Sequence, residues 1–448
     1  MLSFWHAKAE LVVVDSIFVS GNELTKKSII LRELTFYEGN EMERNQLFLD
    51  NIPQSKINLA NLNVFNRVNI NIIEQDSGHL NVYIVVDEKW YWWPIPYLEF
   101  ADRNFNQWYQ FKFDPYRTNY GLYLFRYNIS GRNQTLKLGL SNGYTQRISA
   151  LYKATNLLKN QNGFAELAYS YKSNQEVWYK TENNQLLFFR QFGKIQIKEI
   201  NYTVGLGYRP KFFGRHSLKA NLNQIWVADT LLSETLNPKF LVSNSNQQRI
   251  LTTEYGYESD HRNFRFFPTQ GRYRKFAIGH HFLNETKLNF YSFLLEFSDY
   301  KQLPKIKPLY HWSVATSNTI KLLSGGQLPY YQTRMMGYEY TARGFENRVA
   351  DGKGMFLNKI DLRYEILNRK KFKWPLMPLP NYKVMPVTTF LSLFVDQAFV
   401  QESDKTKYFL GYGVGVNSLF YSDKVFRFEY STGINNSWSL KIHFKKAF

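Results

Sequence analysis

The chain has 448 residues, of which 44% are hydrophobic and 18% aromatic, with no cysteine and a formal net charge of +19. So many aromatic residues exclude a disordered chain, because their burial favours an ordered one. The lack of cysteine excludes a disulfide scaffold and a cysteine-ligated metal site, although it fits both the cytoplasm and the cell envelope. A membrane-spanning helix is excluded as well, since no stretch approaches the roughly 18 consecutive apolar residues that one needs.

Two all-β classes are compatible with this composition. A membrane β-barrel alternates apolar and polar residues along its strands, which keeps the mean hydropathy below zero, and the value here is −0.42. Its outer wall also carries aromatic girdles, which suits the 32 tyrosines, 37 phenylalanines and 10 tryptophans. A large soluble β-sandwich or propeller is also rich in tyrosine and phenylalanine, so composition alone does not decide between the two classes.

Residues 1–10 are expected to be a signal remnant or a disordered N-terminus. The triplet Ala7-Lys8-Ala9 is typical of a signal-peptide cleavage site. The apolar segment before it, Met1 to Trp5, is shorter than the apolar core of about 7 to 15 residues in a complete signal peptide. We therefore favour a remnant whose upstream part is missing.

Residues 11–89 predict a compact two-layer α+β domain. The expected order is strand, helix, helix, strand, strand, over residues 11–19, 25–34, 43–62, 64–73 and 80–87. Thr25 stands where the N-cap of the first helix would be. Pro53 is expected to interrupt the second helix, because proline is costly in a helix interior.

From Pro94 to Phe448 the pattern changes to alternating segments of roughly ten residues, separated by polar turns. At about 22 residues per strand and turn, these 355 residues predict about 16 strands. A closed barrel is favoured, because an open sheet would expose many unpaired edges. We expect the first strand near Leu98 to Phe113 and the last near Trp438 to Phe448. The segment from Trp90 to Pro96, rich in aromatics and proline, is expected to mark the boundary at a membrane interface.

The C-terminal segment predicts an amphipathic strand. Leu440, Ile442, Phe444 and Phe448 lie on one face at period two. Such a strand with a terminal aromatic residue resembles the C-terminal signal of Gram-negative outer-membrane proteins, which favours the membrane barrel. The alternative is an ordinary edge strand at the end of the chain.

Five short motifs resemble those of one family and follow its order. Residues 14–25 and 62–68 resemble two conserved segments of a POTRA domain. The third motif is Asp260-His261-Arg262 with Phe267-Pro268-Thr269-Gln270-Gly271, which is similar to a "D-x-R … P-T-x-G" turn. The fourth is Ala342-Arg343-Gly344-Phe345, which is similar to the "V-R-G-F/Y" tip of the sixth extracellular loop. The fifth is Phe394-Val395-Asp396-Gln397-Ala398, which is similar to an "F-x-D-x-G" strand. Together they resemble the superfamily of BamA, TamA and the two-partner-secretion transporters.

The resemblance implies a fold, a location and a function. The fold would be a membrane all-β protein, with a 16-stranded antiparallel transmembrane β-barrel in the bacterial outer membrane and one periplasmic POTRA domain. The function would be assembly or translocation of client outer-membrane or secreted proteins. It would act through a weakly paired barrel seam, and client segments would add to a POTRA edge strand by β-augmentation.

The departures from the family pattern keep a second function open. The sequence has room for one POTRA domain and shows no plug helix, so neither the BamA assignment nor the two-partner-secretion assignment carries over in detail. Ala342 and Ala398 replace the usual valine and glycine. A barrel that no longer transports and instead anchors other envelope proteins in an outer-membrane complex is therefore the alternative.

The resemblance also implies the site residues. The loop-tip residues Arg343, Gly344 and Phe345 would fold into the lumen, where Arg343 would pair with Asp361 and Asp396 as a latch. A planar guanidinium can bind two carboxylates through its fixed fork. The family turn would consist of Asp260, Arg262, Pro268 and Gly271. The alternative leaves Arg343 solvated on an extracellular turn.

Neither catalysis nor a cofactor is predicted. Gly139-Leu140-Ser141-Asn142-Gly143 matches G-x-S-x-G, but a nucleophile elbow also needs a following helix and an oxyanion loop, so an outer-membrane lipase is a distant alternative. His280-His281 lacks the spacing of a metal site. The positive charge is dispersed among predicted turns, so lipopolysaccharide and phospholipid headgroups are better partners for it than nucleic acid.

Overall fold

A computed structural model describes residues 10–76, 78–100, 112, 114–243, 245–304, 311–377, 383–421, 424–434 and 438–444. Residues 1–9, expected to belong to a signal remnant, lie outside the described residues. The chain forms two compact units, a small one of Met1–Trp93, Arg126–Thr135 and Ala154–Gly163, and a large one of Pro94–Phe125, Leu136–Lys153 and Phe164–Phe448. Within the described ranges, no helix has the length and apolar character needed to cross a membrane.

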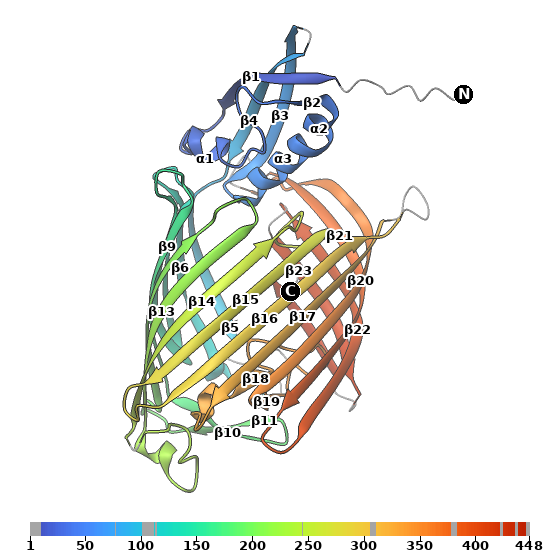
Figure 1. The fold of residues 1–448 in the computed structure, drawn as a ribbon. Helices are drawn as coiled ribbons and strands as arrows, with labels where there is room; N and C mark the ends of the chain where they lie inside the picture. Colours follow the sequence, from blue (N-terminus) through green and yellow to red (C-terminus); the bar gives the residue numbers. More distant parts are fainter. Residues whose placement is uncertain are drawn as a thin grey trace, which may run out of the picture. The chain divides into compact units, whose positions relative to one another are not determined.

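The small unit contains a two-layer α/β domain (Figure 1). Its elements are β1 Leu11–Ser20, α1 Lys27–Leu31, β2 Glu41–Glu43, α2 Arg44–Gln46, the π-helical turn η1 Leu47–Asn51, α3 Ile52–Asn61, β3 Phe65–Asp76 and β4 His79–Glu88. The sheet order is β2-β1-β4-β3, with β1 and β4 parallel and the other pairs antiparallel. Apolar side chains of the helices and strands, such as Ile30, Leu59 and Ile84, form its buried core. The predicted order of elements is present, with the short strand β2 in addition.

The first helix is shorter than predicted, and Thr25 does not cap it. The N-cap position of α1 is Lys26, and no side chain makes a capping hydrogen bond there. The backbone N–H groups of Leu24 and Thr25 donate instead to the Glu88 carboxylate, at 3.1 and 2.7 Å. The start of this segment is thus fixed by a residue far along the chain, which a local capping pattern does not reveal.

Pro53 does not break the second helical region. The segment stays helical through α2, η1 and α3, and Pro53 occupies one of the first two positions of α3. Proline lacks an N–H and its ring crowds the preceding turn, and a wider π-helical turn directly before it accommodates both effects. The irregularity lies one turn earlier, in the π-helical turn Leu47–Asn51.

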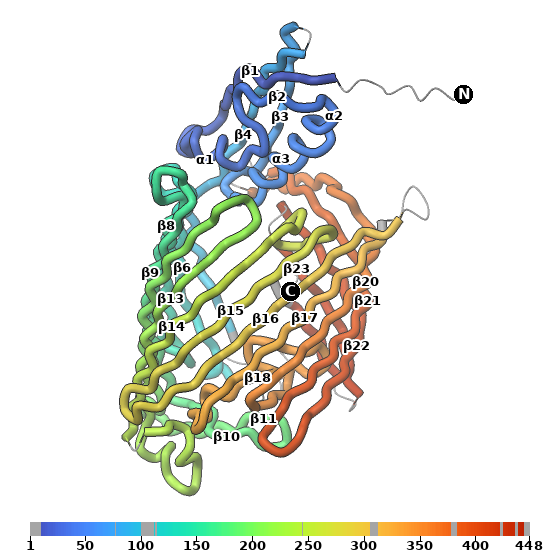
Figure 2. The backbone as a smooth tube through the Cα atoms, viewed as in Figure 1, coloured from blue at the N-terminus to red at the C-terminus, as the bar shows by residue number. Residues whose placement is uncertain are grey.

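The large unit is built on a sheet of 16 strands that forms a barrel (Figures 1 and 2). The strands are β5 Trp92–Phe100, β6 Thr118–Ile129, β7 Gln134–Gly143, β8 Thr145–Leu157, β9 Gly163–Asn174, β12 Ile197–Tyr208, β13 Gly214–Val227, β14 Gln247–Asp260, β15 Gly271–Leu283, β16 Asn289–Gln302, β17 His311–Gly325, β20 Gly354–Lys373, β21 Val384–Gln401, β22 Thr406–Phe420, β23 Lys424–Gly433 and β24 Trp438–Phe444. Each strand pairs with the next of this series. Figure 2 shows β13 to β17 running side by side in the barrel wall.

In the described parts of the connections between these strands, there are two antiparallel strand pairs and three short 3₁₀ helices. They are β10 Glu176–Glu182 with β11 Gln185–Arg190, β18 Arg334–Met336 with β19 Ala350–Asp351, η2 Pro115–Arg117, η3 Asp229–Leu232 and η4 Tyr330–Gln332.

One face of the barrel strands is apolar and exposed. In β12, Tyr202, Val204, Leu206 and Tyr208 are all exposed, and they alternate with residues of the opposite face. The same alternation recurs in β22 at Tyr408, Tyr412, Val414 and Val416. An outward apolar face with an inward mixed face is the pattern of a barrel surrounded by lipid.

The first barrel strand was predicted too far along the chain. It is β5, Trp92–Phe100, so most of the segment expected to be a boundary, including Pro94 and Pro96, belongs to a strand. Residues 101–111 and 113 of the predicted strand lie outside the described residues. Proline is tolerated in β5 because this strand lies at one end of the 16-stranded sheet.

Candidate functional site

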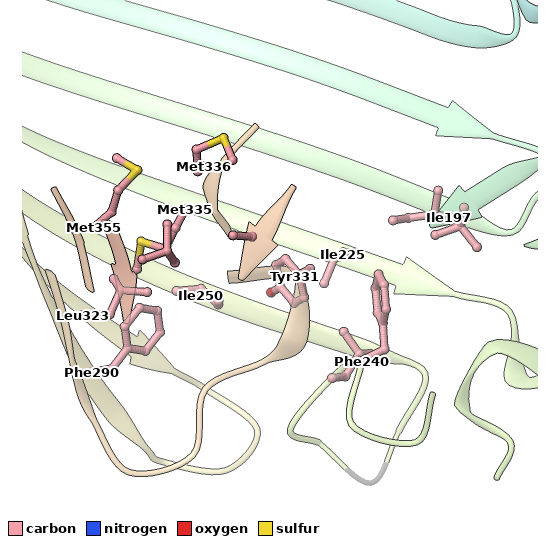
Figure 3. Close-up of a cluster of buried hydrophobic side chains, with 14 of the residues drawn as sticks. Ile197, Ile225, Phe240, Ile250, Phe290, Leu323, Tyr331, Met335, Met336 and Met355 are labelled. Atoms are coloured by element: carbon pink, nitrogen blue, oxygen red, sulfur yellow. The ribbon is translucent and has the colours of Figure 1, made fainter. Parts of the chain in front are cut away.

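The connection between β17 and β20, residues 326–353, carries the predicted loop tip. We call it the inner loop. Six of its side chains belong to a buried apolar cluster: Tyr331, Met335, Met336, Ala342, Phe345 and Ala350. Figure 3 shows Tyr331, Met335 and Met336 among side chains of the barrel strands. The loop is therefore packed against the barrel wall and is not a solvated extracellular turn.

The carboxylates predicted to bind Arg343 lie on the inner face of the barrel. Asp361 of β20 and Asp396 of β21 are 0% exposed, whereas their chain neighbours Ile360 and Val395 are 39% and 37% exposed. Successive side chains of a strand point to opposite faces, so the two carboxylates point away from the lipid-facing surface.

The structure places the Arg343 guanidinium against both of these carboxylates. Nε and Nη2 donate to the two oxygens of Asp396, at 2.9 and 2.6 Å, and Nη2 also donates to Asp361 Oδ1 at 2.6 Å. The backbone N–H of Arg343 donates to Asp396 as well, at 2.9 Å. A third carboxylate, Glu429 of β23, accepts from Nη1 at 3.2 Å. The loop tip is thereby bound to three barrel strands.

These groups belong to a charge-balanced network that is almost inaccessible to solvent. It consists of Arg343, Arg363 and Arg427 with Asp361, Asp396 and Glu429. Burying a charge is costly unless opposite charges and hydrogen bonds compensate it. Here each arginine faces at least one carboxylate, so removing one member leaves a buried charge unpaired, at a cost of about 3–5 kcal/mol.

Close packing supports this ion-pair network. Gly344 has φ of +88°, and a side chain there would lie 2.6 Å from the carbonyl oxygen of Thr432. A Cβ added at Gly411 of β22 would collide with the carbonyl oxygen of Arg343. Phe345 is buried and packs edge-on against Phe409, with 5.3 Å between ring centroids. Glycine at two positions thus permits the close approach of the loop tip to the wall.

The family turn lies between β14 and β15. Asp260 binds Arg262 through two hydrogen bonds, from Nε at 2.7 Å and from Nη2 at 2.9 Å. Gly271 has φ of +102°, and a Cβ there would collide with the carbonyl oxygen of His261. The four predicted residues therefore form a tight turn, in which Pro268 presents its carbonyl oxygen to Arg363.

Sequence reasoning missed three residues of the network: Arg363, Arg427 and Glu429. Arg363 binds Asp361 through Nη2 at 3.0 Å, and Arg427 binds Glu429 at 2.7 Å. A signal was present in each case, since a charged residue stands two positions from another on the same strand face. The alternation of side chains along one strand does not show which charged residues of different strands come together. The register between the strands shows it.

The C-terminal strand β24 has the predicted amphipathic character in its described part. Ile442 and Trp438 are exposed on the outer face, with Leu440 at the same period, while Ser439 is buried on the inner face. The side chain of Phe444 and the whole of Phe448 lie outside what the structure describes. The face that Leu440 and Ile442 share is the lipid-facing one.

The remaining candidates for chemistry lie in regular strands. Ser141 of β7 donates to the carbonyl oxygen of Thr145, where β8 begins, whereas a nucleophile elbow would continue into a helix. His281 contacts Thr252 and Ser292 at 2.8 Å each. Among the described residues, no group of three histidine, cysteine, aspartate or glutamate side chains could hold a metal ion.

The fold and the site define a class of protein, a 16-stranded transmembrane β-barrel with an inward-folded arginine loop and one N-terminal POTRA domain. Residues 128–438 match the Omp85 superfamily domain, and the chain belongs to this superfamily. It is an outer-membrane protein whose POTRA domain lies in the periplasm.

Solved structures show the same fold at low sequence identity. BamA from Haemophilus ducreyi lacking POTRA domains 1–3 is 14% identical with a TM-score of 0.53, covering 97% of this chain and 83% of that chain. CdiB from Acinetobacter baumannii is 12% identical with a TM-score of 0.52, covering 98% and 74% respectively. No match was found among curated proteins.

Proposed function

We propose that this protein assembles client proteins into the outer membrane or translocates them across it, without catalysing a chemical reaction. The observation that carries the proposal is the buried binding of Arg343 to β20, β21 and β23. These strands lead directly to β24, one of the two ends of the 16-stranded sheet. A loop held there can control how easily the end of the sheet separates.

The two ends of the sheet supply the seam that the proposal needs. β5 stands at one end and β24 at the other, and in the described part of the chain no pairing joins them. Pro94 and Pro96 remove two N–H donors from β5, because proline has none. We infer that this junction has fewer ladder hydrogen bonds than the other pairs, so that a client strand can compete for the edge.

The POTRA domain offers a second place for a client. In the order β2-β1-β4-β3, the 12-residue strand β3 lies at an edge and β2 has only three residues. β2 pairs with β1 only at Leu11–Val13, so β3, which pairs with β4 alone, is the longest edge and offers N–H and C=O groups over 12 residues. We propose that client segments add to β3 by β-augmentation.

The proposed function has two versions, insertion of clients, as for BamA, and secretion of clients, as for CdiB. Both proteins support the proposal because their folds resemble that of this chain. We favour insertion. Lipids and lipopolysaccharide are proposed as further partners, since the net charge of +19 suits anionic headgroups.

The second candidate function is anchoring of other envelope proteins. One observation favours it: the inner loop shares a buried apolar cluster with β12 to β17 and with β20 to β22. A polypeptide that crossed the lumen would have to separate these contacts. A barrel that never opens would keep them and serve as a fixed attachment for partners.

One experiment tests the proposal and separates the two candidates. The protein is depleted in cells, the outer-membrane proteome is quantified, and the native protein is purified with its partners. Selective loss of outer-membrane or secreted proteins supports the assembly function. An unchanged proteome and lipid distribution contradict it, and a stoichiometric complex in that case favours anchoring.

A further inference from the structure

The barrel unit contains a cavity of about 290 Å³ that none of the Arg343 network residues lines. Its wall comes from η2, from the segment β8 to β12 and from the inner loop, which contributes Arg334 and Tyr338. The inner loop thus reaches two polar regions besides its apolar packing. One is the ion-pair network at Arg343, and the other is this cavity on the side of the early strands.

The cavity has an excess of positive charge. Four cationic side chains line it, from Arg117, Arg147, Lys172 and Arg334, against the carboxylates of Glu176 and Glu199. Glu176 is already bound, since Arg117 forms an ion pair with it and the Tyr144 hydroxyl donates to it at 3.0 Å. Three cations therefore remain for the single carboxylate of Glu199.

Arg334 has two carboxylates in its surroundings, Glu199 and Asp351, but forms an ion pair with neither. Its guanidinium carbon lies 4.1 Å from the ring centroid of Trp178 and 5.6 Å from that of Tyr338. Within the ranges that the structure describes, no carboxylate comes within 4.0 Å of the charged groups of Arg334, Arg147 or Lys172. Stacking on Trp178 holds the Arg334 side chain in place, so a ligand would bind it with little loss of side-chain entropy.

We propose that the cavity binds a small anion, a phosphate or carboxylate group on a compact molecule, which bridges Arg334 of the inner loop to Arg147 and Lys172 of the wall. Water fits in the same space, at about 30 Å³ a molecule, but it brings no negative charge to the cations that line it. Arginine donors in a fixed plane match the acceptors of both kinds of anion. Trp178 and Phe188 give an apolar surface for the rest of the molecule.

The consequence for function rests on the function proposed above. Arg343 binds the inner loop to β20, β21 and β23, and a bound anion would bind it to β8 and β9. The loop would then be bound to strands on both sides of the seam between β5 and β24, to β8 and β9 on one side and to β20, β21 and β23 on the other. Anion release would remove the bridge to β8 and β9, and the loop would keep the Arg343 network and its apolar packing.

The purified full-length protein in detergent tests this inference. It is titrated by calorimetry with inorganic phosphate and, separately, with phenyl phosphate, at constant ionic strength. We expect saturable one-to-one binding, at least tenfold weaker in Arg334→Gln and in Arg147→Gln, because each removes a charge-assisted contact. Arg348→Gln is the matched control, since Arg348 belongs to the same loop but does not line the cavity.

Two results would overturn the inference: no saturable binding of either compound to the folded protein, or equal weakening in Arg348→Gln. Circular dichroism checks that each variant is folded, and Lys172→Gln replaces a variant that is not. Tighter binding of phenyl phosphate than of phosphate supports the aromatic wall as part of the site. Since binding is measured on the purified chain, its failure leaves the proposed assembly function standing, and the reverse also holds.

Discussion

Arg363 Nη1 donates a hydrogen bond of 2.9 Å to the carbonyl oxygen of Pro268. Pro268 belongs to the turn between β14 and β15, whereas Arg363 lies in β20 and binds Asp361 with the same guanidinium. Asp361 in turn binds Arg343 of the inner loop. Two motifs far apart in the sequence, the turn and the loop tip, are therefore joined through one buried side chain.

Replacing Arg343 tests the network directly. Arg343→Ala leaves Asp361, Asp396 and Glu429 with a deficit of positive charge, so we expect a loss of about 3–5 kcal/mol in unfolding free energy and impaired client assembly. Arg343→Lys should restore only part of both, because an ammonium lacks the planar fork. Unfolding in denaturant and a client-abundance assay measure the two effects. Arg348→Ala, in the same loop, is the control, and equal effects of both alanine variants would count against the network.

Gly411→Ala tests the close approach of the loop tip without touching a charge. The added methyl group would meet the carbonyl oxygen of Arg343, so the loop must move and its ion pairs must lengthen. We expect destabilisation by about 1–3 kcal/mol. Gly326→Ala is the matched control, since nothing lies within 4 Å of its added Cβ. Equal melting temperatures for the two variants would contradict this packing.

Arg363→Gln tests the connection between turn and loop. It leaves Asp361 with a single arginine and removes the donor to Pro268, and we expect a loss of about 3 kcal/mol or more in unfolding free energy. Pro268→Ala keeps the carbonyl acceptor and should cost much less. A double-mutant cycle of Arg363→Gln with Arg343→Ala measures their coupling. Additive effects would mean that the two arginines act independently.

Proline scanning of β3 tests the POTRA edge. Proline between Arg67 and Ile73 removes one N–H at a time from an edge strand, and positions whose N–H points away from β4 should keep the domain folded. At those positions we expect reduced client assembly with an unchanged barrel. Alanine at the same positions is the control. Normal client levels in every folded proline variant would rule out augmentation at β3.

Much of the site could be predicted because its residues stand in recognisable motifs. Arg343 and Asp396 each lie in a segment that resembles a family motif, the resemblance also implies Asp361, and the structure brings all three together. Glu429 and Arg427 lie in a strand without such a motif. Their inward position depends on the register of β23, and a shift by one residue would have turned both to the lipid face.

The errors at the N-terminal side have similar physical causes. Pro94 and Pro96 argue against a strand by local rules, yet β5 lies at an end of the sheet, where proline is tolerated. Threonine is a residue type that is common at helix N-caps, which is why Thr25 was predicted to be one. In the structure, the carboxylate of Glu88, 63 residues away, accepts the hydrogen bond from the backbone N–H of Thr25. Position within the sheet and long-range pairing decided both cases, and neither is visible in a local window of sequence.

A covalent lock across the seam is the most direct test of the central claim that β5 and β24 must separate. The chain has no cysteine, so pairs introduced one in β5 and one in β24 can form only the intended disulfide. The pair that oxidises most completely is placed in cells depleted of the native protein, and client abundance is measured with and without reductant. The account predicts that the oxidised form fails to assemble clients and that reduction restores assembly. Full activity of the locked barrel would contradict it.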